Sequence, residues 1–246
     1  EIVLGNKEWL ITASCSAGPA FEGGGVKFGM RAAVGAIEQV NIDRKTFEPT
    51  CITIGGVKPK GICGSGMIDC LAEMFLSGII DNKGKFKTEI KTNRLREGED
   101  GLEYVLVWGE DSYTGKDIVL TEADIDNIIR TKGAIYAGFC TLLKHVGLTF
   151  DEVKNFYIAG GFGNYIDIEK AVIIGLLPDI PYKKFRFLGN SAIMGSYLVL
   201  VSKKMKEDVE YIARIMTNIE LCNSVIFMDE YVSALFLPNT NIDSFP

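Results

Sequence analysis

The stretch Asn155-Phe-Tyr-Ile-Ala-Gly-Gly-Phe-Gly-Asn164 joins a short strand pattern to a glycine-rich turn. Its aromatic and β-branched residues predict a strand over residues 155–159, and open α/β sheets bind ligands beyond the carboxyl ends of their strands. Glycine has no Cβ, so the backbone of Gly160, Gly161 and Gly163 could lie directly against a base or a sugar. The spacing matches neither G-x-G-x-x-G nor G-x-x-x-x-G-K-[ST], and a plain tight connection would explain the turn equally well.

A long amphipathic helix is predicted before this strand, with Thr121 as its N-cap and its end just before Gly147. Its core face, at spacings of three and four residues, comprises Ile125, Ile128, Ile129, Ile135, Tyr136, Phe139, Leu142, Leu143 and Val146. A second face carries only the small residues Gly133, Ala134, Ala137 and Gly138. That face would admit a neighbouring helix or a flat ligand. A shorter helix is predicted from Asp167 to Gly175, so the order helix, strand, glycine turn, helix indicates an α/β fold.

The rest of the chain adds further strands and helices. Strands are predicted at residues 1–4 and 9–13 (a hairpin), 36–42, 51–54, 105–107 and 118–120 (a second hairpin), 185–188 and 224–227. Helices are predicted at residues 67–75, with Ser65 as N-cap, from 189 to about 202, and at 203–221. Residues 81–101 are polar and are expected to have weak structure.

Composition excludes several classes of protein. The chain has 246 residues, a net charge of −6 and 47% hydrophobic residues, which suits one large globular domain or two small lobes. It has no basic run interleaved with aromatics, so nucleic acid and acidic membranes are not expected partners. Its apolar stretches are far shorter than the roughly 18 residues that span a bilayer. Six scattered cysteines predict buried thiols in a reducing cytoplasm, and a start at Glu1 without Met suggests a piece of a longer protein.

Other candidate residues have structural explanations beside the functional ones. The string Gly61-Ile-Cys-Gly-Ser-Gly66 opens a helix and could hold an anion, or could be a well-capped helix start. Cys63 could have a lowered thiol pKa there, but no histidine partner is in view and a structural role is favoured. His145, the only histidine, lies at a helix carboxyl end that favours a cation, and we interpret it as structural.

The stretch Ala13-Ser-Cys-Ser-Ala-Gly-Pro-Ala-Phe-Glu-Gly-Gly-Gly25 follows the first hairpin and is unusually rich in small residues. Three explanations are open at this point: a phosphate-binding loop, a cysteine site at Cys15, or a turn that only needs small residues.

Taken together, three strings resemble a known family. Residues 14–25, 61–66 and 159–164 are similar, in this order, to strings of the ATP-dependent reductive activators of corrinoid proteins. Residues 157–164 resemble the adenosine motif of the superfamily of sugar kinases, heat-shock chaperones and actin, and residues 188–196 resemble its second connecting helix. The resemblance implies a ribonuclease-H-like, actin-like ATPase fold that forms part of a two-lobed domain. Residues 1–246 would be the C-terminal domain, without the ferredoxin and first phosphate-loop regions.

The resemblance also implies a function. Such proteins use ATP to return an oxidised corrinoid, Co(II), to Co(I), with the electron supplied by a [2Fe-2S] domain that is not in this chain. The partner would be a corrinoid iron–sulfur protein or a corrinoid methyltransferase protein, and a homodimer is left open. We expect ATP or ADP, with Mg in the full protein, as the nucleotide. On the adenosine side the expected residues are Gly160, Gly161, Phe162, Gly163, Lys132 and Gly24.

A hypothesis for the opening loop follows from the same resemblance. The loop would face the corrinoid and offer an oxygen ligand to cobalt, for which we favour Ser14, with Ser16 and Glu22 as competitors. Cys15 also matches a cluster-binding cysteine of the related dehydratase activators, but no second cysteine stands out as its partner. No resident metal site and no catalytic residue of this chain is expected.

The departures from the family pattern matter as much. The first phosphate loop, with its catalytic carboxylate, is not in this sequence, so the chain alone should hydrolyse ATP poorly and should keep only the adenosine half of the pocket. Two other functions stay open: a small-molecule kinase of the same superfamily, and a scaffold that has kept the fold without a nucleotide.

Overall fold

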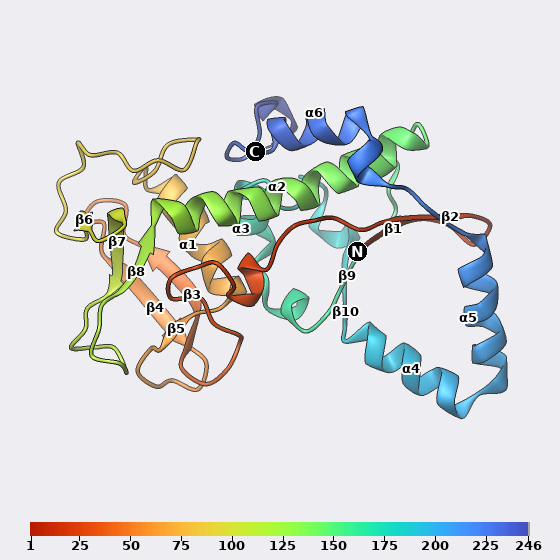
Figure 1. Ribbon diagram of the computed structural model, residues 1–246, viewed down its shortest axis with the longest axis horizontal. Helices are drawn as coiled ribbons and strands as arrows, with labels where there is room; N and C mark the ends of the chain where they lie inside the picture. Colours follow the sequence, from red (N-terminus) through yellow and green to blue (C-terminus); the bar gives the residue numbers. More distant parts are fainter. Residues whose placement is uncertain (246) are drawn as a thin grey trace.

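In the described part of the chain the strands form four small sheets, which six α-helices cover and connect (Figure 1). The computed structural model describes residues 1–245, apart from the side chains of Phe162, Asn164 and Ser244. Within this part of the chain no helix is both long and apolar enough to cross a bilayer.

The first sheet contains the predicted N-terminal hairpin. Strands β1 (Ile2–Gly5) and β2 (Leu10–Ala13) pair antiparallel, and β11 (Met216–Asn218) pairs parallel with β2. A separate parallel pair joins β9 (Phe156–Ala159) to β10 (Phe185–Gly189). The predicted strand before the glycine turn is thus confirmed.

The third sheet, in the order β4-β3-β5, packs on the first helix. Strands β3 (Ala36–Ile42) and β4 (Pro49–Thr53) pair antiparallel, and β5 (Gly61–Ile62) pairs parallel with β3. Helix α1 (Gly64–Leu76) begins one turn earlier than predicted, because the extended Cys63, not Ser65, is its N-cap. Cys63 is buried and its Sγ donates to the carbonyl of Ile37 at 3.2 Å, which supports its structural interpretation.

The fourth sheet leads into the longest helix. Strands β6 (Leu95–Gly98), β7 (Gly101–Val107) and β8 (Ile118–Thr121) form an antiparallel meander. Helix α2 (Glu122–His145) follows, with the predicted N-cap: the Thr121 hydroxyl accepts from Asp124 N, and the Asp124 carboxylate accepts from Thr121 N. This reciprocal capping box fixes the helix start. The predicted core face of α2 is buried at Ile125, Ile128 and Leu142.

The C-terminal third of the chain is mostly helical. Helices α3 (Ile168–Ile173), α4 (Ser191–Val201), α5 (Lys203–Ile215) and α6 (Val225–Ser233) follow the glycine turn. The strand predicted at residues 224–227 is wrong, since the Ser224 hydroxyl caps α6 by accepting from Phe227 N. The helix predicted at 203–221 ends at Ile215, where the chain turns into β11.

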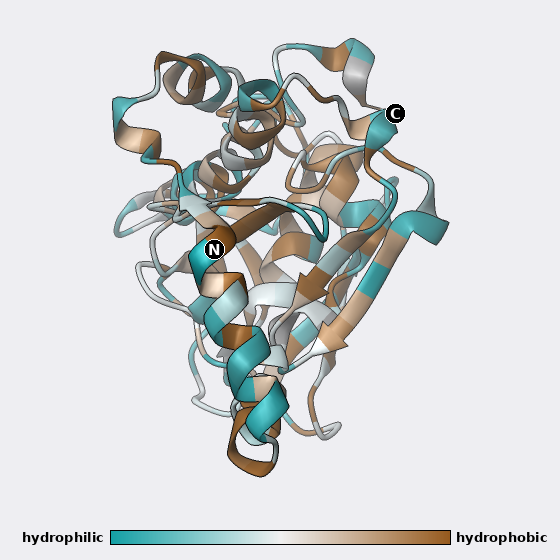
Figure 2. Ribbon diagram, turned by 90° about the vertical axis from the view of Figure 1, so that its right-hand side faces the viewer, coloured by the Kyte–Doolittle hydropathy of each residue, from teal (hydrophilic) through white to brown (hydrophobic). Residues whose placement is uncertain are grey.

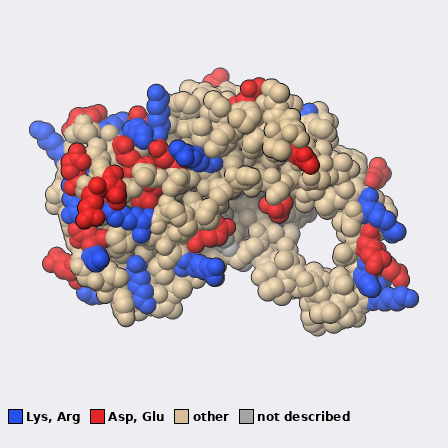
Figure 3. Space-filling view, viewed as in Figure 1, with Lys and Arg blue, Asp and Glu red and all other residues tan. Residues whose placement is uncertain are grey.

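Helices α4 and α5 form an arm beside the main body (Figure 1). Several large apolar side chains of α4 are exposed: Ile193, Met194, Tyr197, Leu198, Leu200 and Val201. Figure 2 shows the apolar tip where α4 meets α5, and Figure 3 shows that charged side chains gather over the β6–β8 end and over α5, leaving the α4 region without them. Within the arm, α4 therefore presents an apolar surface and α5 a charged one.

Candidate functional site

Two glycine turns meet at the carboxyl end of the parallel pair β9–β10. The amide of Gly160 donates to the carbonyl of Gly189 at 2.7 Å, and both residues have positive φ, 106° and 63°. A Cβ built on Gly160 or Gly161 would meet no atom within 4 Å, whereas one on Gly163 would lie 2.5 Å from Ile158 Cγ2. The turn is therefore open in front and packed against β9 behind. The side chain of Phe162, predicted to face adenosine, lies outside the described residues.

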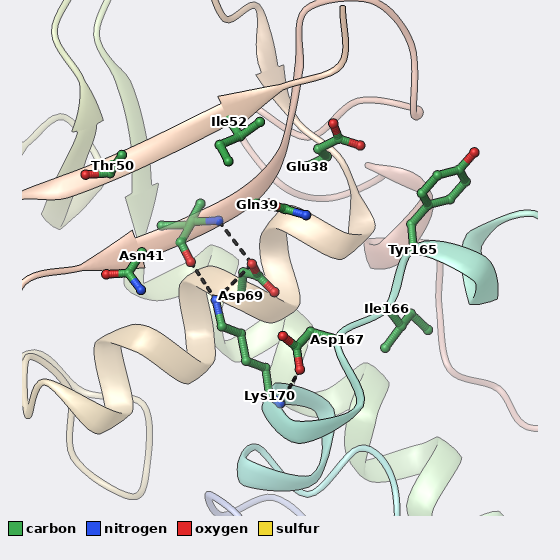
Figure 4. A pocket seen from close by; sticks show the side chains of 11 residues that line it. Glu38, Gln39, Asn41, Thr50, Ile52, Asp69, Tyr165, Ile166, Asp167 and Lys170 are labelled. Atoms are coloured by element: carbon green, nitrogen blue, oxygen red, sulfur yellow. Dashed lines mark hydrogen bonds and ion pairs between the residues drawn. The ribbon is translucent and has the colours of Figure 1, made fainter. Parts of the chain in front are cut away.

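The chain that follows this turn forms one wall of a pocket of about 460 Å³ (Figure 4). Tyr165, Ile166 and Asp167 line this wall, and β3 and β4 form the opposite one. The residues lining the pocket from the two strands are Glu38, Gln39, Val40, Asn41, Thr50 and Ile52. We call this the strand–turn pocket.

An ion pair closes the floor of the strand–turn pocket. Lys170 Nζ donates to the carbonyl of Val40 at 2.7 Å and to Asp69 Oδ2 at 3.0 Å, and it lies 3.2 Å from Glu73 Oε1. Burial alone would lower the pKa of Lys170, but the hydrogen bond and charge of Asp69 and the charge of Glu73 raise it above its ordinary value. Lys170 is therefore protonated at neutral pH, and the floor ties α3 to α1 and β3.

The charge of the strand–turn pocket limits what it can bind. Its lining includes the carboxylates Glu38, Asp69 and Asp167 against the single cation Lys170. An excess of negative charge disfavours phosphate, whereas carboxylates and amides suit ribose hydroxyls and the polar edge of a base. This pocket can accept the nucleoside half of a nucleotide but is a poor site for its triphosphate.

The loop after β2, residues 14–30, carries the residues predicted to face a corrinoid. Ser14, Ser16 and Glu22 are exposed, and the Ser14 hydroxyl donates to Glu1 Oε1 at 2.9 Å. Gly24 is half-buried, and a Cβ there would lie 2.8 Å from Pro19 Cγ. The three oxygen-bearing side chains are accessible, while Gly24 serves the packing of the loop.

Cys15 points the other way from its two serine neighbours. Its Sγ occupies the space where a Cβ on Gly138 of α2 would lie, and burial raises the pKa of its thiol. A thiol in this position is protonated at neutral pH, which disfavours metal binding. In the part of the chain described, no three His, Cys, Asp or Glu side chains gather as a metal site would require.

Lys132, predicted on the adenosine side, is buried in the structure. Its side chain is 0% exposed, and its Nζ donates to the carbonyls of Phe236 and Pro238 at 2.5 and 2.7 Å. Burial lowers its pKa to about 7. Neither Lys132 nor Gly24 lines the strand–turn pocket, so these placements do not support the predicted contacts with adenosine.

A second pocket, of about 520 Å³, lies between two open sheet edges. Residues 1–4 of the β1 region and residues 155–159 of the β9 region line it, over apolar side chains of α2 such as Ile135, Phe139 and Leu142. β1 pairs only with β2, and β9 pairs only with β10, among the described strands. The facing edges of β1 and β9 are thus both unpaired, and we call the space between them the edge gap.

Sequence reasoning missed Lys170 and the carboxylates around it. A signal was present: Asp69 and Glu73 are acidic residues four apart in the otherwise apolar α1. Buried carboxylates need a cation or hydrogen bonds, so a partner was predictable. Its identity was not, since Lys170 lies 101 residues from Asp69 along the chain.

Comparisons with known proteins agree with this architecture. A family model described as the C-terminal domain of RACo, the ASKHA domain, matches residues 1–246. A solved structure described as a reductive activator for corrinoid, iron–sulfur protein superposes with a TM-score of 0.94 and 52% identity, covering 99% of this chain and 39% of that one. The corrinoid activation enzyme RamQ of Eubacterium limosum is 37% identical over 94% of this chain and 40% of its own length. A [Co(II) methylated amine-specific corrinoid protein] reductase of Methanosarcina barkeri is 27% identical, over 96% of this chain and 44% of its own.

Proposed function

The chain belongs to the RACo C-terminal ASKHA domain family, and on this premise we propose that it docks a corrinoid protein and supports ATP-dependent reduction of Co(II) to Co(I). The chain spans about two fifths of the length of the relatives it matches. We therefore assign the electron donor, a [2Fe-2S] domain, to another part of the full protein. Such a cluster would supply the one electron that converts Co(II) to Co(I), and ATP would be hydrolysed with water to ADP and phosphate.

The observation that carries this proposal is that the loop of residues 14–30 exposes three side chains with oxygen atoms. Ser14, Ser16 and Glu22 are exposed there, whereas the apolar Ala20 and Val26 hold the same loop in the core. An axial ligand is one of the main levers on the potential of a macrocycle-bound metal. A hydroxyl from this loop, for which we favour Ser14, would bind cobalt in place of the corrinoid's own lower ligand. Co(II) would then be easier to reduce.

The experiment that tests this function uses the full-length protein, a Co(II) corrinoid protein, a low-potential reductant and ATP. We expect the absorption spectrum of Co(I) corrinoid to appear when ATP is present and not to appear when ATP is omitted. An equal rate without ATP, or no Co(I) with any corrinoid protein of the methylamine, methoxyaryl or acetate type, would contradict the proposal.

For the nucleotide, we propose that the nucleoside half lies against Gly160 and Gly161 and enters the strand–turn pocket. When bound, ATP supplies the free energy that separates the partners after electron transfer, and Mg accompanies its phosphates in the full protein. The open front of the turn and the acidic pocket support the nucleoside half alone. The phosphates would then contact parts of the protein outside residues 1–246, and the isolated chain should hydrolyse ATP poorly.

Gly161 offers a clean test of this nucleotide site. Its φ and ψ are −62° and −35°, which any residue adopts, and a Cβ there would meet nothing within 4 Å. We expect Gly161→Val in the full-length protein to leave the unfolding temperature unchanged and to weaken ADP binding by about tenfold or more, because the side chain fills ligand space. Gly195→Ala, on α4 and equally free of neighbours, is the matched control and should bind ADP normally. Equal affinity in both variants would remove the turn from the site.

We further propose that residues 1–246 form a C-terminal domain that another segment of the longer protein completes. The edge gap supports this, because unpaired backbone groups over an apolar floor are costly to leave open. An extended strand there would unite the two small sheets into one. Amides of β1 and β9 should then exchange with solvent slowly in the full-length protein and quickly in residues 1–246 alone; equally fast exchange in both would contradict the proposal.

Two finer proposals concern the surroundings of the protein. All six cysteines are free thiols in the structure, which fits a reducing cytoplasm.

A homodimer is compatible with α6, whose Val225, Met228 and Val232 are exposed at spacings of three and four residues. Light scattering of the full-length protein decides between one copy and two.

A further inference from the structure

Three polar side chains on one face of α2 each bind a backbone atom of the loop formed by residues 14–30. Asp124 Oδ1 accepts from Lys27 N at 2.8 Å, Asn127 Nδ2 donates to the carbonyl of Gly25 at 2.7 Å, and Thr131 Oγ1 donates to the carbonyl of Ala17 at 2.7 Å. Spacings of three and four residues place the three side chains on one helical face. We call them the α2 clamp.

The loop lies beside the part of α2 between Asp124 and Gly138 (Figure 1). As the residue numbers of the clamp rise, those of the bound loop residues fall, so the two segments run in opposite directions. Beyond Thr131, Gly138 continues the contact by leaving room for the sulfur of Cys15. The loop is thus held by the helix from Cys15 to Lys27.

The loop needs such external anchors because its own structure is weak. It contains one 3-10 turn (Ala20–Glu22), and Gly18, Gly23 and Gly25 have positive φ of 73°, 91° and 71°. Glycines lose more conformational freedom on folding than other residues, and the loop pairs with a strand only near its end, where Gly29 bridges Ile62 of β5. Its two buried apolar anchors, Ala20 and Val26, lie in its middle and end. Near Ser16 the loop is therefore held by the Thr131–Ala17 bond and by the packing of Cys15 against Gly138.

A purely helical role does not explain the clamp. Asp124 also caps α2, so its two carboxylate oxygens divide between the helix start and the loop. The Thr131 hydroxyl, by contrast, donates to the loop and does not cap the helix. Thr141, another buried threonine of α2, instead donates to the carbonyl of Ala137 in its own helix at 2.7 Å, the usual bond of a threonine within a helix.

We propose that Asn127 and Thr131 are positioning residues, which act through the loop backbone to set where Ser14, Ser16 and Glu22 meet a docked corrinoid protein. This inference rests on the function proposed above and names the part of α2 that serves it. A part-buried carbonyl with a hydrogen-bond donor holds a fixed place, and Ala17 is one residue from Ser16 and three from Ser14. Removing the Thr131 hydroxyl leaves this carbonyl without its donor while keeping the shape of the side chain.

The test compares Thr131→Val, Thr131→Ser and the matched control Thr141→Val in the full-length protein. A part-buried carbonyl that has lost its donor lets a segment open more often, so the amides of residues 14–18 in Thr131→Val should exchange roughly five- to a hundredfold faster than in the wild type. The affinity for a Co(II) corrinoid protein should fall by a similar factor. Thr131→Ser should restore both, and Thr141→Val should change neither while having a similar unfolding temperature.

Each result has a definite meaning. Unchanged exchange in the loop of Thr131→Val overturns the positioning role, whether or not a partner binds. Faster exchange with full affinity for the Co(II) corrinoid protein overturns the link between loop position and docking. Failure of the wild type itself to bind any Co(II) corrinoid protein contradicts the proposed function instead, and the exchange measurement still decides whether the clamp holds the loop.

Discussion

Two neighbouring residues of α2 hold two different segments in different ways. Thr131 donates one neutral hydrogen bond to Ala17 in the loop of residues 14–30, whereas Lys132 donates two bonds from a buried ammonium to Phe236 and Pro238 after α6. A neutral bond contributes about 1 kcal/mol, and a buried charge depends on every partner it has. The position of the loop therefore depends on neutral hydrogen bonds that pH does not change, whereas the C-terminal segment is held by a lysine whose charge depends on pH.

Lys132 should make the free energy of unfolding depend strongly on pH, and this effect should be the largest of those predicted here. Burial lowers the pKa of Lys132 to about 7 in the folded state, below the value of about 10.4 of an unfolded lysine. Between these values the unfolded chain binds more protons, so the free energy of unfolding should rise with pH, by up to about 1.4 kcal/mol per pH unit. Chemical denaturation at pH 6 to 10 measures this slope.

The variant Lys132→Met should abolish that slope between pH 7 and 10. It should also lower the stability at pH 10, because two buried carbonyls lose their donor. Lys144→Met is the control on the same helix: Lys144 forms a surface ion pair with Glu230, and its hydrogen bond with Glu230 raises the pKa of Lys144, so its loss should leave this pH window unaffected. An unchanged slope in Lys132→Met would contradict the account.

A smaller loss of stability is expected from a substitution at the contact between Cys15 of the loop and Gly138 of α2. Gly138→Ala would place a methyl group against Cys15 Sγ and Ile2 Cδ1, so the free energy of unfolding should fall by about 1–3 kcal/mol. In the double variant with Cys15→Ala the sulfur is gone, and at least half of the loss should return. Additive losses in this double-mutant cycle would show that the two residues do not touch.

The smallest effect is expected at Asn127, which bonds the loop at its exposed end. Asn127→Ala should lower the free energy of unfolding by about 0.5–1.5 kcal/mol. The dependence of this free energy on pH should be the same as in the wild type. A loss larger than that of Lys132→Met at pH 10 would reverse the comparison between the two sides of α2.

Local patterns were enough to predict much of the fold. The hairpin at the start of the chain, the strand before Gly160 and the Thr121 cap of α2 all follow from alternation, β-branched residues and capping chemistry, which act within a few residues. The short apolar run at residues 224–227 was assigned to a strand, since four residues carry too little periodicity to separate strand from helix. The Ser224 side chain decides the matter in the structure by capping α6.

The site was less predictable, because its contacts are long-range. The open glycine turn was found from Gly160 and Gly161, but the strand–turn pocket joins β3 and β4 to a segment more than a hundred residues away, and no local pattern reports that pairing. Lys132 was assigned to the adenosine side from the family resemblance; it lies next to the stripe of small residues formed by Gly133, Ala134, Ala137 and Gly138. The same stripe lets α6 approach, with Ala234 O 3.1 Å from a Cβ built on Gly133, and Lys132 is buried under the segment that follows.

In the proposed function, the loop of residues 14–30 meets cobalt through a side-chain oxygen. The most direct test of this contact is the ATP-dependent rate of Co(II) reduction by full-length Ser14→Ala, measured beside Ser16→Ala and with ADP affinity as the control for folding. We predict that the rate of Ser14→Ala falls about tenfold or more, with nucleotide affinity unchanged and a smaller effect in Ser16→Ala. A Ser14→Ala protein that activates its corrinoid partner at the full rate would contradict the assignment.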